Sequence, residues 1–224
     1  MKTVAISDLE ETITACRRCP RLVAWREQVA REKRRAYRDQ EYWGKPVPGF
    51  GDPSARLLIV GLAPGAHGSN RTGRMFTGDA SGDFLYPALY RAGFASQPQA
   101  SHREDSLTLN DCFISAVGRC APPDNKPTRD EIANCLPYLK QEMDLLSNLQ
   151  GIVALGSIAF NETLSLLRVK SSGYTFGHGQ FYQPGNRQPW LLASYHPSRQ
   201  NTQTGRLTVE MFDTIWKTAQ EKLK

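Results

Sequence analysis

The chain has 224 residues, of which 40% are hydrophobic and 22% are charged, and its formal net charge is +6. This length suits one α/β-sized domain, expected over 1–224, that buries roughly 70% of its unfolded surface without disulfide bonds. The first ten residues lack the pattern of a signal peptide, and no apolar run approaches the ~20 residues that cross a membrane. We therefore expect a cytoplasmic monomer with no membrane contact, and the positive charge favours a polyanionic partner.

Two helices are predicted before the first strand. Ser7 and Glu10 have capping-box spacing, which predicts a short helix that runs into the first cysteine pair. Residues 21–43 predict a longer helix in which basic and acidic side chains are interleaved. Such interleaving is typical of a solvated helix face with i,i+4 ion pairs, rather than of a dedicated DNA-binding arm.

Four short apolar runs predict buried strands, and a helical pattern follows each of them. This alternation predicts an α/β fold with a mostly parallel sheet flanked by helices. The strands are expected at 56–60, 112–118, 151–156 and 190–195.

Two of the helices carry further signals. Thr128 and Glu131 have capping-box spacing at the start of the helix that follows the second strand. The last helix has an apolar stripe that predicts its core-facing side: Leu207, Met211, Ile215 and Ala219.

The glycine-rich segment GLAPGAHGSNRTGRMFTGD, at 61–79, follows the first strand. Its glycines allow close backbone approach and suit a phosphate, although glycine-rich turns are also common in proteins that bind nothing there. It has neither the Walker pattern nor the dinucleotide fingerprint. Because ligands bind at the carboxyl ends of parallel strands, we expect it to meet RCAPPDN, at 119–125, and SYHPSRQN, at 194–201, in one site.

Four of the five cysteines are candidate metal ligands. Cys16 and Cys19 form a C-x2-C pair, and Cys120 and Cys135 lie 15 positions apart around the loop after the second strand. Four thiolates suit a zinc site or an iron–sulfur cluster, and the spacing alone does not choose between them. Simple buried cysteines and a redox-active pair are the alternatives, and Cys112, inside a strand, is expected to be a free buried thiol.

Three segments carry a family resemblance: GLAPGAHGSNRTGRMFTGDASG at 61–82, RCAPPDNKPT at 119–128 and YHPSRQNTQTGRLT at 195–208. Together with the four cysteines, they resemble the family 5 (type B) uracil-DNA glycosylases, from Cys16 to the last helix. The resemblance implies a three-layer α/β/α fold around a mostly parallel four-stranded sheet. It also implies a structural [4Fe–4S] cluster that ties the N-terminal helical segment to the loop beside the site, with these ligands: Cys16, Cys19, Cys120 and Cys135.

The resemblance also implies roles in the hydrolysis of an N-glycosidic bond. Asp79 is expected to activate water beside the cationic sugar, and His196 to donate to the pyrimidine O2 of the leaving base. Asn125 is expected to contact water or base, and Phe76 to stack on the base that leaves the helix. Taken without the family, these residues would be a helix N-cap, a structural histidine, a turn asparagine and a core aromatic.

Other residues of the motifs are expected to contact DNA. Arg199 and Gln200 are placed to enter the gap that an extruded nucleotide leaves in the duplex, and Arg206 to contact a phosphate. The backbone N–H groups between Ala63 and Gly68, with Gly65 among them, are expected to contact phosphate as well.

The sequence departs from related patterns at the pocket. Ala116 stands where family 4 enzymes carry an asparagine that reads uracil, and Leu62 where they carry an acidic residue. A pocket without that amide leaves fewer polar atoms unpaired against another base, so hypoxanthine and xanthine are expected substrates besides uracil. Met75 replaces the usual proline, which is expected to relax the loop before Phe76. No lyase lysine is recognisable, which favours simple hydrolysis that initiates base-excision repair.

Two other classes of protein fit part of the pattern. A metal-stapled nucleic-acid-binding module without catalysis would explain the charge and the cysteines, but does not require Asp79, Asn125 and His196 at converging strand ends. A hydrolase of free nucleotides would need Mg²⁺, and the sequence shows no acidic cluster to hold that ion.

Overall fold

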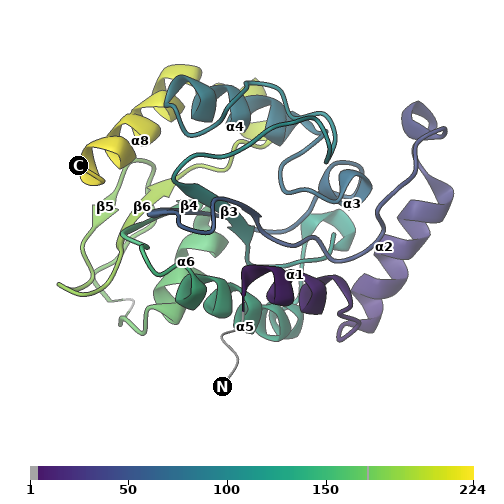
Figure 1. The fold of residues 1–224 in the computed structure, drawn as a ribbon, viewed down its shortest axis with the longest axis horizontal. Coiled ribbons are helices and arrows are strands. Elements are labelled where there is room, and N and C mark those ends of the chain that lie inside the picture. The colour runs from purple at the N-terminus through teal and green to yellow at the C-terminus, as the bar shows by residue number, and fades with distance from the viewer. Residues whose placement is uncertain (1–4, 171) are drawn as a thin grey trace.

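The computed structural model describes residues 5–170 and 172–224. Its centre is a six-stranded sheet in the order β1-β3-β2-β4-β6-β5 (Figure 1). The four central strands pair in parallel, so the predicted mostly parallel four-stranded sheet is confirmed. They are β3 (Cys112–Ala116), β2 (Leu57–Gly61), β4 (Gly151–Leu155) and β6 (Trp190–Ser194).

Two antiparallel edge strands extend this sheet beyond the prediction. β1 (Phe50–Gly51) pairs with β3, and β5 (Phe181–Tyr182) pairs with β6. Each has two residues, which is too short for an apolar or alternating pattern to predict it. All residues of the four parallel strands are buried, which is why those strands read as continuous apolar runs.

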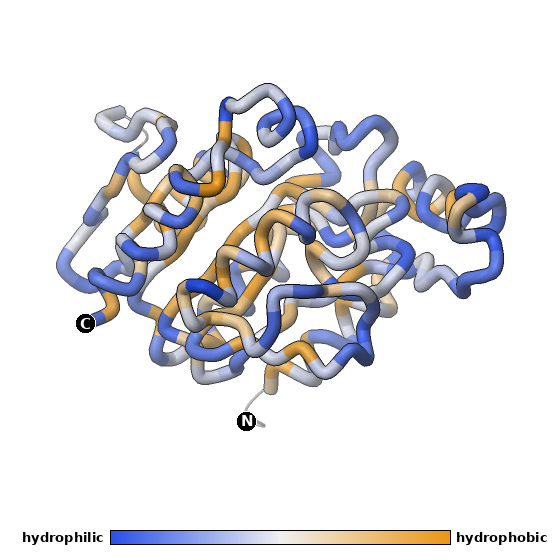
Figure 2. Tube along the Cα trace, turned by 90° about the horizontal axis from the view of Figure 1, so that it is seen from above, coloured by the Kyte–Doolittle hydropathy of each residue, from blue (hydrophilic) through white to orange (hydrophobic). Residues whose placement is uncertain are grey.

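Helices cover both faces of the sheet, as the three-layer prediction requires (Figure 1). Apolar side chains of the strands alternate between two core clusters, one on each face. Figure 2 shows the apolar residues gathered along the central elements and the hydrophilic ones around them. One face carries α4 (Ala80–Arg91) and α8 (Val209–Lys222), and the other carries α1 (Ile6–Thr14), α5 (Arg129–Leu145) and α6 (Ser157–Leu166).

The helix starts agree with the prediction in one case and not in the other. Thr128 and Glu131 form the predicted reciprocal capping box of α5, with N–H to oxygen distances of 2.8 and 3.3 Å. The predicted box of Ser7 and Glu10 is wrong, because α1 begins at Ile6. There the carboxylate of Asp8 accepts from the N–H of Ala5 at 3.1 Å, so the cap lies two residues earlier than predicted.

The core-facing side of α8 is also partly different from the predicted stripe. Ile215 and Ala219 are buried, as is Leu207 just before the helix, whereas Met211 is only half-buried. Phe212 and Trp216 occupy the remaining core positions. The larger aromatic side chains therefore shift the buried face by about one position, within the apolar stripe that a helix of this kind presents.

The predicted helix over 21–43 is much shorter than expected. α2 (Pro20–Glu32) ends before Lys33, which has φ of 53°. A short turn, η1 (Arg35–Tyr37), follows, and the chain then runs back beside α3 (Ser69–Thr72), where the N–H of Trp43 donates to the carbonyl of Arg71 at 2.8 Å. In the described ranges, no helix is both long and apolar enough to cross a membrane.

Candidate active site

A pocket of about 750 Å³ lies at the carboxyl ends of the parallel strands. Its walls come from the glycine-rich segment after β2, the end of β3, the turn η2 (Pro123–Asn125) and the loop after β6, which runs into α7 (Arg199–Gln203). The three polar segments of the sequence therefore meet in one place. The predicted residues that line the pocket are Ala63, Gly65, Phe76, Asp79, Ala116, Asn125, His196, Arg199 and Gln200.

Asp79 combines a helix cap with a carboxylate oxygen that faces no protein donor. Its Oδ1 accepts from the N–H groups of Ser81 and Gly82 at 3.0 and 3.1 Å, and so caps α4. Within the described ranges, Oδ2 receives no hydrogen bond. Burial raises the pKa of Asp79, and the two backbone N–H bonds oppose this shift. The same side chain thus fits both the N-cap and the pocket role.

The glycine-rich segment approaches this carboxylate more closely than a side chain would allow. A Cβ at Gly68 would lie 1.9 Å from Asp79 Oδ2, and a Cβ at Gly65 would lie 2.9 Å from it. Gly68 has φ of −99°, so the requirement is for space rather than for a left-handed backbone. These two glycines therefore set the distance between the segment and the carboxylate.

Phe76 forms one wall of the pocket in a strained conformation. Its φ is 52°, which a bulky side chain rarely adopts and which costs roughly 1–3 kcal/mol. The ring lies against Gly61, where a Cβ would be 2.7 Å from the ring Cζ. The ring centres of Phe76 and His196 are 5.8 Å apart, with an angle of 32° between the planes. Both side chains line the pocket, and the face of an aromatic ring suits a planar ligand.

His196 is held as a neutral imidazole. Burial lowers its pKa to about 4, so the ring carries no charge near neutral pH and one ring nitrogen carries a proton. The side chain of Asn201 donates to the carbonyl of His196 at 2.8 Å, which fixes the backbone just after β6. A neutral N–H donor therefore lies in the pocket beside the aromatic wall.

Asn125 and Ala116 contribute opposite kinds of surface. Asn125 is exposed at the pocket rim and has φ of 56°, after Asp124 with φ of 54°, so two consecutive residues turn in the left-handed region. Asparagine and aspartate tolerate this region better than most residues. Ala116 ends β3 beside Gly61, is 1% exposed and presents only a methyl group.

Sequence reasoning missed several residues of this pocket. Arg34, Tyr37 and His67 line it. The first two were assigned to a solvated helix, and His67 was one polar residue among many in its segment. Arg206 does not line the pocket. Its guanidinium carbon lies 4.7 Å from the centre of the Tyr195 ring, outside the cavity.

Comparison with known proteins agrees with this geometry. Residues 48–220 match the family model described as the uracil DNA glycosylase superfamily. The chain belongs to this superfamily. It is 57% identical over 203 residues to the Type-5 uracil-DNA glycosylase of Thermus thermophilus, covering 90% of this chain and 91% of that protein. The Type-5 enzymes of Mycobacterium leprae and Mycobacterium bovis are 52% and 51% identical, each over 97% of this chain and over 95% and 81% of their own lengths.

These relatives confirm the resemblance to family 5 and the prediction of a DNA glycosylase. These matches favour an enzyme that acts on DNA over a binding module without catalysis and over a hydrolase of free nucleotides.

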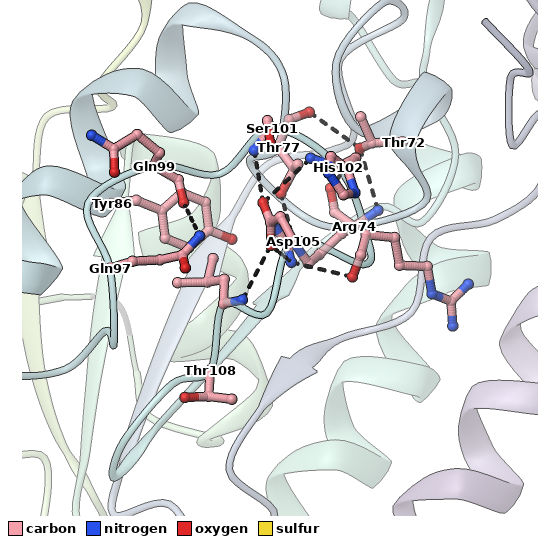
Figure 3. Close-up of polar contacts among 12 residues, drawn as sticks. Thr72, Arg74, Thr77, Tyr86, Gln97, Gln99, Ser101, His102, Asp105 and Thr108 are labelled. Atoms are coloured by element: carbon pink, nitrogen blue, oxygen red, sulfur yellow. Dashed lines mark hydrogen bonds and ion pairs between the residues drawn. The ribbon is translucent and has the colours of Figure 1, made fainter.

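A buried ion pair holds Arg74, two residues before Phe76 in the glycosylase (Figure 3). Arg74 donates two parallel bonds to Asp105, each of 2.7 Å, and both side chains are almost fully buried. Arg74 Nε also donates to Thr77 at 2.9 Å. The carbonyl of Met75 accepts from Tyr86 at 2.7 Å, which holds the residue before Phe76. The effect of methionine in place of proline stays a prediction.

The four candidate ligand cysteines come from separate elements and lie close together. Three are buried and Cys16 is half-buried. Cys19 and Cys120 share a small buried cluster with Leu22. Burial raises the pKa of Cys120, the nearby Cys135 and Cys16 add to the rise, and Arg26 opposes it, so that the pKa is about 12. In the part of the chain that the structure describes, no three potential ligands converge as a site for a single metal ion.

Cys112 differs from these four. It is fully buried in β3, and its Sγ lies 3.5 Å from the carbonyl of Phe94. Burial raises the pKa of this thiol. It is therefore the predicted free thiol of the core, which fits the behaviour of cysteine as a small buried hydrophobe.

The first prediction concerns the glycine beside Asp79. We expect Gly68→Ala to reduce the single-turnover rate of base release by about 100-fold, because the added methyl forces the segment and the carboxylate apart. The variant is expected to remain folded, as circular dichroism would show. Gly185→Ala is the matched control, since its Cβ would meet only the flexible side chain of Gln188 at 3.4 Å. A wild-type rate for Gly68→Ala would contradict the argument.

The second prediction concerns the buried ion pair. We expect Asp105→Asn to lower the free energy of unfolding by about 3 kcal/mol, because it leaves Arg74 buried without its countercharge. Asp213→Asn breaks the exposed pair with Arg91 and is expected to cost less than about 1 kcal/mol in the same urea titration. Equal losses in the two variants would refute a special role for the buried pair.

The effect of Asp105→Asn is also expected to depend on pH. Burial acts against ionisation, but the bonds from Arg74 and from backbone N–H groups hold the pKa of Asp105 well below its usual range. A carboxyl with a lowered folded pKa stabilises above its unfolded pKa of about 3.9 and loses this contribution as the pH falls. The difference between wild type and variant should therefore narrow below about pH 4.

Proposed function

We propose that this glycosylase hydrolyses the N-glycosidic bond of uracil, hypoxanthine and xanthine in DNA, as a monofunctional enzyme that initiates base-excision repair. The observation that carries the proposal is the position of Asp79. Within the described ranges its Oδ2 accepts no hydrogen bond, and Asp79 lines the same cavity as Phe76 and His196. An anionic oxygen, an aromatic ring and a neutral N–H donor are what the departure of a planar base from a sugar requires.

The roles of the residues follow from their chemistry. The target nucleotide must leave the helix stack, and stacking on Phe76 would offset part of that cost of a few kcal/mol. Asp79 Oδ2 would stabilise the cationic sugar and orient the water that attacks C1′. His196, neutral because of its lowered pKa, would donate to the departing base as negative charge develops on it. Asn125, at the rim, would hold the water or the base.

The pocket surface supports acceptance of more than one base. At Ala116 the floor offers a buried methyl group and no amide. A site that requires hydrogen bonds to one base rejects others strongly, whereas an apolar surface rejects them weakly. Hypoxanthine and xanthine, like uracil, are products of deamination, and mispaired bases flip most easily.

The glycine-rich segment offers donors for the DNA backbone. Within the described ranges, the N–H groups of residues 63–68 donate to no acceptor of the protein, and Pro64 has none to donate. Donors that lie at a pocket edge without partners suit a phosphate. Arg199 and Gln200, exposed at the start of α7, would enter the gap in the duplex. Arg206, held on Tyr195, would reach a phosphate farther along.

We also propose that a structural [4Fe–4S] cluster is held by Cys16, Cys19, Cys120 and Cys135. A zinc ion needs four ligands at about 2.3 Å from one point, whereas a four-iron cluster takes one thiolate on each iron. Four cysteines that lie close together and are mostly buried supply the number of thiolates that such a cluster takes. The cluster would cross-link the N-terminal helices to the loop of η2 and to α5, completing one domain.

A buried guanidinium supports an anionic group at this place. Arg26 is 2% exposed and, within the described ranges, forms no ion pair with a carboxylate. Its Nη1 donates to Cys120 Sγ at 2.9 Å, and its Nε lacks a partner. A buried cation without a countercharge is costly. Thiolates carrying a cluster would supply that countercharge.

The third prediction tests the proposed reaction. We expect release of free uracil, hypoxanthine and xanthine from otherwise identical duplexes without added metal, with strand cleavage only after alkali. Asp79→Asn is expected to lower the single-turnover rate by at least about 100-fold while DNA affinity persists, because it removes the anionic oxygen and keeps the shape. Cleavage of uracil alone would disprove the broad specificity, and no release of any base would disprove the function.

The fourth prediction tests the cluster. We expect the purified protein to be brown and to contain four irons per chain, as four thiolates in this arrangement imply. Cys120→Ser should lose the visible absorbance and unfold at a lower temperature, because the cross-link is lost. Cys112→Ser is the control and should keep the absorbance, although it buries a hydroxyl. A full set of irons in Cys120→Ser would refute the assignment.

A further inference from the structure

The segment 33–42, between α2 and Trp43, forms a wall of the catalytic pocket that the proposed function does not yet use. Arg34 and Tyr37 line the same cavity as Asp79. The segment leaves the end of α2 on the side of the molecule where α3 and the glycine-rich segment lie (Figure 1). It therefore borders the opening through which a nucleotide would enter.

Arg71 fastens this segment to the glycine-rich segment. Its guanidinium donates to the carbonyls of His67 and Gly78, each at 2.8 Å, and to the side chain of Gln40. Its central carbon lies 4.0 Å from the centre of the Tyr37 ring. Arg71 is 7% exposed and pairs with no carboxylate in the described part of the chain. The buried Arg71 thus joins Gly78, the residue before Asp79, to Gln40 and Tyr37 of the segment 33–42.

A second fastening runs through a tyrosine. Tyr42 accepts from the backbone N–H of Arg34 at 3.3 Å, and its hydroxyl lies 3.1 Å from His67 Nδ1. Tyr42 is 8% exposed. The backbone that carries Arg34 is therefore fixed against the pocket, while its side chain is exposed.

The segment carries more positive than negative charge, with Lys33, Arg34, Arg35 and Arg38 against Asp39 and Glu41. Lys33 is half-exposed, and Arg34, Arg35 and Arg38 are exposed. None of them forms an ion pair with a described carboxylate, although exposed arginines elsewhere do, as Arg91 does with Asp213. Clustered like charges repel one another unless a polyanion neutralises them, and the phosphates of DNA have the required charge and spacing.

We propose that the segment 33–42 binds the DNA strand beside the extruded nucleotide, with Arg34 on a backbone phosphate and Tyr37 stacked or packed against the nucleotide that enters the pocket. Tyr37 is suited to this because one side of its ring is covered by Arg71 and the side chain lines the cavity. The inference rests on the proposed function for the identity of the ligand, but it concerns DNA binding and is measured without hydrolysis.

The test compares Arg34→Ala with Arg187→Ala. Arg187 is exposed and precedes β6, so it lies at the amino ends of the parallel strands, away from the pocket at their carboxyl ends. The probe is a labelled duplex with one tetrahydrofuran abasic analogue, which the enzyme does not hydrolyse. Its affinity is measured by fluorescence anisotropy between about 50 and 200 mM salt. Arg34→Ala should reduce the slope of log affinity against log salt by about one, and Arg187→Ala should keep the wild-type slope.

A wild-type slope for Arg34→Ala, or an equal change in both variants, would overturn the proposal. Failure of the proposed function is a different result, namely a wild type that releases no base whatever its salt slope. A reduced slope for Arg34→Ala supports the strand-binding segment in either case.

Tyr37 is tested by a pair of variants. The probe for Tyr37 is a duplex with one 2′-fluoro-2′-deoxyuridine, which resists hydrolysis and keeps the base that the ring would contact. Tyr37→Phe keeps the ring and should bind this duplex like wild type, whereas Tyr37→Ala should bind it about fivefold or more weakly. In single-turnover experiments on a uracil-containing duplex, Tyr37→Ala should raise the enzyme concentration that gives half the maximal rate and leave the maximal rate unchanged. Unchanged affinity of Tyr37→Ala, or a loss confined to the saturated rate, would show that the ring does not contact DNA.

Discussion

The Asp79 carboxylate joins the start of α4 to the glycine-rich segment, and the pocket is arranged around this contact. Oδ1 is committed to two backbone N–H groups, which fixes the direction of the side chain. Oδ2 is left against Gly68, at a distance that no other residue type at that position would permit. Burial raises the pKa of the carboxyl, and the two N–H bonds oppose this shift. The N–H bonds therefore hold the carboxylate in place although it is partly removed from water.

The surroundings of Asp79 store strain and buried charge that only a well-packed structure can maintain. Phe76 turns with φ of 52° between the ion pair of Arg74 and Asp105 on one side and Gly61 on the other. Arg71 is buried, pairs with no carboxylate in the described part of the chain, and donates to the carbonyls of His67 and Gly78. The backbone strain and the buried charges are confined to a few residues that shape the pocket. This is expected where a fixed geometry of the site matters more than local stability.

The two buried arginines near the pocket and the cysteines suggest a common design. Arg71 connects the segment 33–42 with the pocket, and Arg26 connects α2 with Cys120, in the loop that continues to Asn125. Under the two proposals, Arg26 lies beside the thiolates of a cluster, and Arg71 holds the segment that presents Arg34 to DNA. In this view α2 and the segment after it are held by the cluster at one end and present cations to DNA at the other.

The sequence by itself determined the family, the four parallel strands and most of the pocket lining. Strands buried on both faces appear as uninterrupted apolar runs, and Asp79, Asn125 and His196 stand in motifs directly after them. Tertiary structure decided the rest. The end of α2 at Glu32 was not predictable, because Arg71 and His67, some thirty residues away, hold the turned segment. The same holds for the two-residue edge strands, for the pairing of Arg74 with Asp105, and for the place of Arg34 and Tyr37 in the pocket. Each depends on contacts between distant residues, which local patterns of charge and hydropathy do not contain.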